Sequence, residues 1–159
     1  MNIYKLIIKP IAFRFDAEFV HETTIKFGRF LGRYFTTRKI IDFLYNYKNN
    51  KLHTEVCGIK FKNPIGLAAG FDKNGLITDI LPSVGFGFME IGSVTGEKCF
   101  GNKKPRLWRL PKDHSISVNY GLCNDGAEVI VRRLKKKKFR IPLGVSIAKT
   151  NDFSIKGDG

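Results

Sequence analysis

The chain has 159 residues, enough for one domain with a buried core, because proteins of this size bury about 68–70% of their unfolded surface. Its 43% hydrophobic content is globular, and no run approaches the roughly 20 apolar residues that span a bilayer. The formal charge of +14 favours anionic partners, such as acidic lipid, nucleic acid or phosphorylated ligands. The three cysteines are widely spaced without a CxxC pair, so neither a zinc site nor a disulfide framework is predicted.

Residues 1–51 form a basic, aromatic-rich module with ten Lys or Arg against four acidic residues. Asp16 can cap a helix whose apolar residues recur every three or four positions as far as Leu31, and Thr37 can cap a second that extends through Leu44. We therefore expect a pair of amphipathic helices. Their apolar faces either pack on the rest of the protein or rest on a membrane surface with Lys and Arg facing the head groups.

Residues 54–159 alternate strand and helix patterns, which predicts an α/β fold with a parallel sheet. The expected elements are a hairpin in VCGIKFKNP, strand 65–69, helix 76–81, strand 86–94, an irregular insert, helix 125–137 and strand 143–147. Asp125 and Glu128 have the spacing of a capping box at the start of the last helix.

Two motifs are interpreted as structural. The basic run Lys135 to Lys138 ends a helix, where cations are favourable, so no nucleic-acid partner is expected. His21 begins HETTI, in which Ile25 stands where the second histidine of a HExxH metal site is required. We therefore predict that His21 is an ordinary helix residue and that the chain holds no metal.

The stretch GLAAGFDKNG, residues 66–75, follows an apolar run and surrounds one lysine with small residues. Small side chains let a flat ligand approach the backbone closely. Lys73 then supplies a positive charge that can bind a carboxylate or stabilise negative charge on a reduced aromatic cofactor. A plain strand-to-helix turn is the alternative interpretation.

Three separated motifs, FKNPIGLAAGFDKNG, GFGFMEIGSVT and GNKKPRLWRLPKD, resemble those of the quinone-dependent (class 2) dihydroorotate dehydrogenases in order and spacing. The resemblance covers about residues 16–151. It implies a (β/α)8 TIM barrel, with about the first three βα units present, that uses FMN to oxidise dihydroorotate to orotate in pyrimidine synthesis. The helical module is similar to the family's membrane-associated quinone tunnel. A peripheral membrane protein is implied, on the cytoplasmic side of a cell membrane or on an organelle inner membrane.

The resemblance also assigns site residues. The AAGFDK motif matches the family's FMN contacts, and Lys73 additionally meets the orotate carboxylate. Ser146 replaces a family asparagine that hydrogen-bonds FMN, and it can still donate and accept one hydrogen bond. The expected FMN-binding residues are Ala69, Gly70, Phe71, Asp72, Lys73, Ser93 and Ser146.

The expected substrate loop departs from the family pattern NxxGFNN. In VNYGLCNDG, Tyr120, Gly121 and Leu122 match the loop, whereas Val118 and Cys123 occupy asparagine positions. Asn119 is the residue we expect to replace the missing amide. Two alternatives stay open: a related flavin oxidoreductase that acts on another dihydropyrimidine, and a non-catalytic basic binding module derived from a barrel.

The family's serine base lies on a later loop, so it is expected beyond Gly159. A barrel of this type typically needs about 250 residues. We therefore expect that this polypeptide is an incomplete piece which, alone, neither holds FMN tightly nor turns over dihydroorotate.

Overall fold

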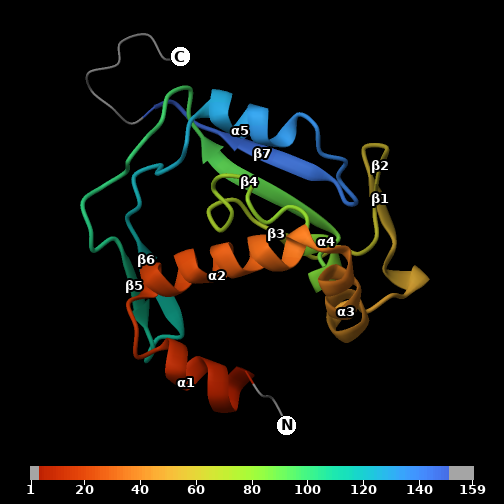
Figure 1. Cartoon of the computed structure of the whole chain (residues 1–159), viewed down its shortest axis with the longest axis horizontal. Helices are drawn as coiled ribbons and strands as arrows, with labels where there is room; N and C mark the ends of the chain where they lie inside the picture. The colour runs from red at the N-terminus through yellow and green to blue at the C-terminus, as the bar shows by residue number, and fades with distance from the viewer. Residues whose placement is uncertain (1–3, 151–159) are drawn as a thin grey trace.

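The structure, a computed structural model, describes residues 4–150, and a three-stranded parallel sheet lies at its centre (Figure 1). The strands are β3 (Gly66–Leu67), β4 (Phe88–Val94) and β7 (Leu143–Ile147), in the order β3-β4-β7. Gly66 pairs with Phe88, and Met89 pairs with Leu143. Because all three strands run in one direction, their carboxyl ends lie at one edge of the sheet, as the alternating sequence pattern predicted.

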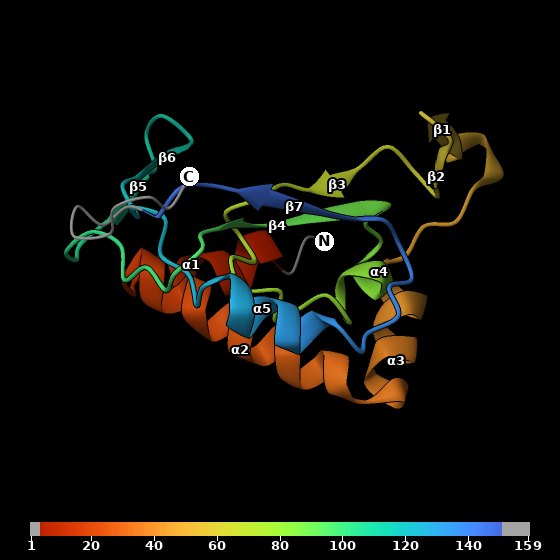
Figure 2. The same ribbon diagram turned by 90° about the horizontal axis from the view of Figure 1, so that it is seen from above.

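The helices cover one side of this sheet (Figure 2). Helix α5 (Ala127–Leu134) contributes Ile130 to a cluster with Ile91 and Val94 of β4. A second cluster joins β4 to α2 (Ala17–Arg33) and to the loop after β3, and it consists of Ile25, Ile77, Ile80, Leu81, Met89 and Ile141. Alternation along β4 places Met89 and Ile91 on the same face, so both are buried beneath the helices.

The N-terminal segment is helical, as expected. It comprises a π-helical turn (Tyr4–Ile8), α1 (Lys9–Ala12), α2 and α3 (Phe35–Tyr45). Asp16 caps α2, because its carboxylate accepts a hydrogen bond from the Phe19 amide at 2.9 Å. The predicted Thr37 cap was wrong, since α3 begins at Phe35 and the Thr37 hydroxyl donates instead to the carbonyls of Leu31 and Tyr34.

Helix α2 has two different faces. On the inner face, a Cβ atom at Gly28 would lie 3.1 Å from the Ile77 side chain, and one at Gly32 would lie 3.3 Å from the Ile80 backbone nitrogen. These glycines let the helix approach the loop after β3 closely. The outer face carries Phe19, Phe27 and Phe30, each more than half exposed. Packing on the protein is therefore confirmed for one face, and the other face presents aromatic rings to the surroundings.

Two hairpins flank the sheet. Strands β1 (Thr54–Val56) and β2 (Ile59–Phe61) form the predicted hairpin, which follows a 3-10 turn (Asn50–Leu52). The turn residues Cys57 and Gly58 have φ values of 50° and 78°, typical of tight hairpin turns. The insert predicted to be irregular instead contains a second hairpin, β5 (Leu107–Leu110) with β6 (Ser115–Val118).

Two helix predictions need correction. The helix expected at residues 76–81 is not found: this segment forms turns, and the short helix α4 (Leu81–Val84) follows it with a proline in its first turn. The predicted capping box of α5 does not form, and Gly126 occupies the N-cap. Asp125, just before the helix, pairs with Arg133 at 2.8 Å, and Glu128 pairs with Arg132 at 2.5 Å. Both acids therefore pair with basic residues of α5.

Candidate functional site

The carboxyl edge of the sheet gathers the three segments that the sequence singled out. The loop after β3 is joined to the end of β4, because the Gly70 amide donates to the Gly92 carbonyl at 2.8 Å. Ser93 of β4 and Ser146 of β7 lie side by side, with their hydroxyl oxygens 2.8 Å apart. The predicted FMN residues therefore converge, although 53 positions of the chain separate Ser93 from Ser146 alone. Their role in binding FMN stays a prediction.

Asp72 holds the glycine-rich loop in shape. Its side chain is buried, and its two oxygens accept hydrogen bonds from the amides of Leu76 at 2.8 Å and Ile77 at 2.9 Å. These bonds fix the segment that had been predicted as a helix. The Asp72 carboxylate is therefore engaged within the loop, and it can serve the predicted flavin site by keeping its neighbours in place.

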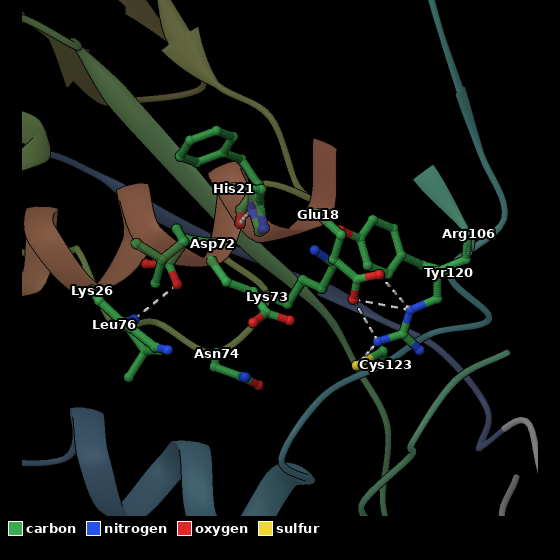
Figure 3. Close-up of a pocket in the computed structure, with 13 residues that line it drawn as sticks. Glu18, His21, Lys26, Asp72, Lys73, Asn74, Leu76, Arg106, Tyr120 and Cys123 are labelled. Atoms are coloured by element: carbon green, nitrogen blue, oxygen red, sulfur yellow. Dashed lines mark hydrogen bonds and ion pairs between the residues drawn. The ribbon is translucent and has the colours of Figure 1, made fainter. Parts of the chain in front are cut away.

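Lys73 points from this loop into a cavity of about 210 Å³ between α2 and the substrate-loop segment (Figure 3). Its Nζ atom lies 3.9 Å from the centroid of the Tyr120 ring. Burial and the nearby Arg106 charge lower the pKa of Lys73. Within the described part of the chain no carboxylate lies at ion-pair distance from this ammonium group, so a negatively charged ligand would find an uncompensated cation here.

Tyr120 lies between two cations. The Arg106 guanidinium carbon is 5.0 Å from the ring centroid, and Lys73 approaches the same ring. Burial raises the pKa of Tyr120 to about 12, so the phenol is neutral at physiological pH. Its hydroxyl is buried, and it has no hydrogen-bond partner among the described residues. A ligand in the cavity could supply that partner.

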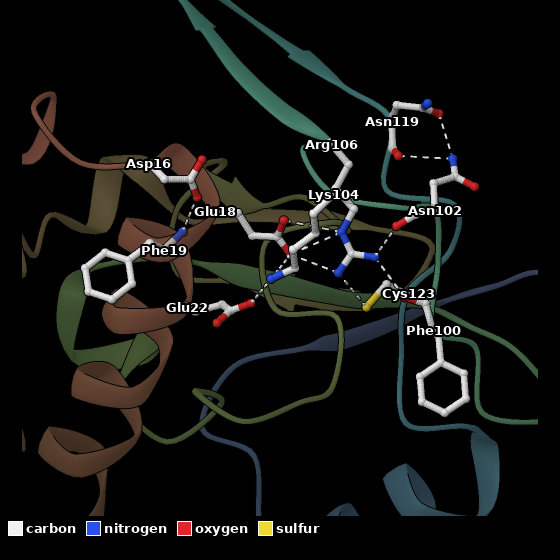
Figure 4. A network of polar contacts seen from close by, with 10 residues as sticks. All are labelled: Asp16, Glu18, Phe19, Glu22, Phe100, Asn102, Lys104, Arg106, Asn119 and Cys123. Atoms are coloured by element: carbon white, nitrogen blue, oxygen red, sulfur yellow. Dashed lines mark hydrogen bonds and ion pairs between the residues drawn. The ribbon is translucent and has the colours of Figure 1, made fainter.

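A buried ion pair between Arg106 and Glu18 lies in the lining of the cavity, and Figure 4 shows its contacts. Arg106 Nη2 lies 2.8 Å from Glu18 Oε1, and Arg106 Nε donates to both carboxylate oxygens. Lys104 adds a second contact to the same Oε1 atom at 3.1 Å. Burial acts to raise the pKa of Glu18, but hydrogen bonds and charge from Arg106 and Lys104 outweigh it and hold this pKa below its ordinary value. The pair joins the N-terminal module to the insert.

His21 lies on helix α2, as predicted, and it also belongs to this cavity, which the sequence interpretation did not anticipate. It lines the cavity, its Nε2 atom lies 2.8 Å from the Phe71 carbonyl, and its ring meets the Phe71 ring edge-on at 5.0 Å. The carbonyl can only accept, so Nε2 is the donor. Burial, together with the charge on Lys73, lowers the pKa of His21 and favours the neutral imidazole. The i, i+3 spacing of Glu18 and His21 was the available signal, because it places them on one helix face.

Of the residues predicted to form the substrate loop, the structure places only some at the cavity. Tyr120 lines the cavity, whereas Asn119, Gly121 and Leu122 are not among its described lining residues. The Asn119 side chain is held elsewhere, because its oxygen accepts a hydrogen bond from Asn102 Nδ2 at 2.8 Å. Cys123, which sequence reasoning noted only as a departure, lines the cavity and accepts a 3.5 Å hydrogen bond from Arg106 Nη2.

Residues 4–150 contain neither a candidate metal site nor a helix that could span a membrane. Three or more His, Cys, Asp or Glu side chains do not converge anywhere in this part of the chain in a way that could hold a metal ion. None of its helices combines the length and apolar character needed to cross a bilayer.

Comparison with known proteins identifies this arrangement. The model of a family described as dihydroorotate dehydrogenase matches residues 51–155, which include the glycine-rich loop, Ser93, Tyr120 and Ser146. The chain belongs to the dihydroorotate dehydrogenase family. Residues 151–155 of this match lie outside the part that the structure describes.

Curated relatives extend the match toward the N-terminus. The dihydroorotate dehydrogenase (quinone) of Christiangramia forsetii is 42% identical over 147 residues, which cover 92% of this chain and 43% of the relative. The protein of the same name from Chloroflexus aurantiacus is 41% identical over 151 residues, covering 92% and 42% respectively. The similarity is thus to the quinone-dependent members of the dihydroorotate dehydrogenase family, as the three sequence motifs had indicated. The chain spans less than half the length of these relatives.

Solved structures agree on the fold. The ligand-free Eimeria tenella DHODH gives a TM-score of 0.63 at 32% identity, covering 74% of this chain and 38% of that chain. The same enzyme in complex with ferulenol gives 0.61 at 33% identity, covering 72% and 35%. The predicted α/β barrel architecture is therefore confirmed, with β3, β4 and β7 as the strands of the first three βα units.

Proposed function

We propose that this site takes part in the oxidation of dihydroorotate to orotate, with FMN as cofactor and a quinone as electron acceptor, in pyrimidine biosynthesis. The names of the two relatives, both dihydroorotate dehydrogenase (quinone), support this substrate and this acceptor. The observation that carries the proposal is the Lys73 ammonium, half-buried at the carboxyl edge of the sheet, in contact with the Tyr120 ring and lining the cavity with it. Active sites of these barrels lie at this edge.

The residues at this edge fit a flavin. Gly70 has a φ of 100° and open space where a Cβ atom would stand, so a flat ring can approach the backbone there. The paired hydroxyls of Ser93 and Ser146 offer a hydrogen-bond donor and acceptors beside it. FMN, when bound, would accept the two electrons that leave dihydroorotate and pass them to the quinone. Ala69, Gly70, Lys73, Ser93 and Ser146 are the residues that would hold it.

Lys73 would anchor the substrate. The orotate carboxylate would pair with an ammonium group that has no carboxylate partner within residues 4–150, and the charge of the ligand would offset the cost of burying the lysine. The buried Tyr120 hydroxyl lacks a partner in the same part of the chain, and we infer that it hydrogen-bonds the substrate.

The N-terminal module would bring the quinone. Helix α2 supplies His21 to the cavity that holds Lys73, so a molecule bound along α2 can reach the flavin loop. The exposed Phe19, Phe27 and Phe30, with the basic residues of the same segment, suit a surface that rests on a membrane. We therefore propose peripheral membrane association, on the cytoplasmic side of a cell membrane or on an organelle inner membrane.

The residues at Cys123 and Asn119 favour a second candidate substrate, which should be tested in the same assay. Cys123 lines the cavity where the family pattern has an asparagine, and Asn119 is engaged by Asn102. These two observations favour a different pattern of contacts to the pyrimidine ring. Another cyclic dihydropyrimidine is therefore the alternative substrate of the same flavin chemistry.

The test joins this chain to the portion of the Christiangramia forsetii relative that its match does not cover. We expect the purified chimera to carry bound flavin and to form orotate when dihydroorotate and a quinone are supplied. Lys73→Ala should lower kcat/KM for dihydroorotate by at least about 100-fold, because it removes a buried charge contact. Lys62→Ala, which truncates an exposed lysine near β2, should leave it unchanged.

The outcomes separate the alternatives. Flavin binding with turnover of another dihydropyrimidine, but not of dihydroorotate, would favour the second substrate. A folded chimera that binds no flavin would contradict the proposal altogether. Equal effects of Lys73→Ala and Lys62→Ala would show that the observation on which it rests is irrelevant to the reaction.

A further inference from the structure

A second cavity, of about 550 Å³, is lined by residues of the N-terminal helical turns and of the β5–β6 hairpin. It shares no described lining residue with the Lys73 cavity. Its described lining residues are Tyr4, Lys5, Lys9, Phe13, Arg109, Leu110, Pro111, His114, Ser115 and Ile116. Neither the flavin loop nor the substrate loop contributes to it, so the proposed reaction leaves this cavity unexplained.

The cavity is positively charged. Lys5, Lys9 and Arg109 line it together with His114, and none of its described lining residues is acidic. Neither Lys9 nor Arg109 has a carboxylate at ion-pair distance within residues 4–150, and an anion between them would reduce the repulsion of their charges. The charge pattern therefore points to an anionic ligand.

Aromatic stacking holds two of these cations in place. Lys9 Nζ lies 5.1 Å from the centroid of the Phe13 ring, and Arg109 Cζ lies 4.8 Å from the same centroid. Arg109 also donates a 2.7 Å hydrogen bond to the Phe15 carbonyl. Among the described residues this is the one hydrogen bond that Arg109 donates, although a guanidinium group has five N–H donors. The site thus presents fixed cations with donor capacity that a phosphate can use.

Apolar side chains surround the charged part. Tyr4 and Ile116 of the lining are more than half exposed, and the neighbouring Leu6, Ile7 and Ile11 are exposed to a similar extent. A free phosphate would make no use of these side chains. A nucleic acid would be expected to follow a longer row of cations and to avoid such an apolar border. An amphiphile with an anionic head satisfies both halves of the site.

We propose that this cavity binds the phosphate headgroup of an acidic phospholipid, with Lys9 and Arg109 on the phosphate and the acyl chains against the exposed apolar residues of the N-terminal turns. The inference rests on the proposed membrane association and adds a lipid preference to it. Binding there would also fix the β5–β6 hairpin against the membrane surface.

The hairpin contains a built-in reporter, because Trp108 is the single tryptophan of the chain and it precedes Arg109. The first experiment titrates the full chain with dihexanoyl phosphatidylglycerol below its micelle concentration and follows Trp108 fluorescence. We expect a saturable change, little change with dihexanoyl phosphatidylcholine, and weaker binding of inorganic phosphate. Equal responses to the two lipids would overturn the proposal, and so would phosphate that binds as tightly as phosphatidylglycerol.

The second experiment measures cosedimentation with phosphatidylcholine vesicles, with and without phosphatidylglycerol. The double variant Lys5→Gln and Lys9→Gln should lose about fivefold in affinity per lysine for the acidic vesicles only. Lys136→Gln and Lys138→Gln remove the same charge beyond α5 and serve as the control. Circular dichroism should show that both double variants keep the native helix content. Equal losses in the two variants would mean that only overall charge matters, and the cavity would be rejected.

The design separates this inference from the membrane proposal. If the native chain binds both kinds of vesicle equally, membrane association stands and the headgroup site is refuted. If it binds short-chain phosphatidylglycerol saturably but neither kind of vesicle, the headgroup site stands and membrane association is refuted.

Discussion

Arg106 and Glu18 form a buried, bidentate ion pair across 88 positions of the chain, with Arg106 6% exposed and Glu18 4% exposed. Glu18 lies in the first turn of α2, and Arg106 lies just before the β5–β6 hairpin. Arg106 also donates to the carbonyls of Phe100 and Asn102 and stacks near Tyr120. The N-terminal helix is thereby coupled to the ring that faces Lys73.

Removing one member of this pair should be costly. Glu18→Gln leaves the Arg106 charge buried without its counter-charge, so we expect the free energy of unfolding to fall by about 3–5 kcal/mol. Urea denaturation of the chain measures this change. Glu22→Gln is the matched control, because Glu22 bonds only the exposed Lys104 among the described residues, and it should cost about 0–1 kcal/mol. Similar costs for the two variants would contradict the assignment.

The protonation of His21 predicts a pH dependence. The pKa of His21 is lower in the folded chain than its ordinary value of 6.5, so below that pH the unfolded chain binds a proton that the folded chain does not. Above about pH 7.5 the unfolded chain takes up no such extra proton. As the pH falls from 6.5 toward the pKa of folded His21, this proton uptake by the unfolded chain lowers the free energy of unfolding. His21→Gln should remove this part of the pH dependence, which is measured as the urea midpoint of unfolding between about pH 5 and 7.5. A variant with the same pH dependence as the native chain would argue against a lowered pKa of His21.

Gly92 should tolerate no side chain. It has a φ of 104°, and an added Cβ atom would lie 2.5 Å from the Ser146 carbonyl oxygen. Gly92→Ala therefore combines backbone strain with a clash between β4 and β7, and we expect a loss of at least about 3 kcal/mol. Gly58→Ala tests strain alone, because its φ is 78° and the space around it is open, and it should cost about 1 kcal/mol. Thermal denaturation compares the two variants, and equal losses would rule out the clash.

The Tyr120 hydroxyl gives a prediction that separates stability from binding. Since it has no partner within residues 4–150, Tyr120→Phe removes no hydrogen bond from the described protein, and stability should change by less than about 0.5 kcal/mol. If orotate receives that hydrogen bond, its affinity for the flavin-loaded chimera should fall about tenfold. Calorimetric titration with orotate checks the second part. Unchanged affinity would remove Tyr120 from the substrate contacts.

Local sequence patterns predicted the elements that depend on local causes. The Asp16 cap, the Cys57–Gly58 turn and strand β4 follow from neighbouring residues, and all three were found. The helix expected at 76–81 was not found: the segment forms turns whose Leu76 and Ile77 amides donate to the Asp72 carboxylate, and α4 begins only at Leu81. Periodicity alone does not register these contacts, because they depend on the burial of Asp72.

The parts of the site that were missed depend on long-range contacts. Glu18 belongs to the site because it pairs with Arg106, and His21 because it donates a hydrogen bond to the Phe71 carbonyl 50 positions away. Strand β5 was missed because LWRL lacks the regular alternation of apolar and polar residues that marks a strand, whereas SISV of β6 does alternate but is only four residues long. Motifs that follow parallel strands were easier to group, since the topology itself brings their carboxyl ends together.

The two glycines on the inner face of α2 have a consequence for how this protein can vary. Gly28 and Gly32 fix the helix through the shape of its backbone, and the phenylalanines opposite them take no part in that contact. Substitutions among Phe19, Phe27 and Phe30 should therefore be nearly neutral for folding. Helix α2 therefore has an inner face that is constrained by steric fit and an outer face that can diverge while the fold is kept.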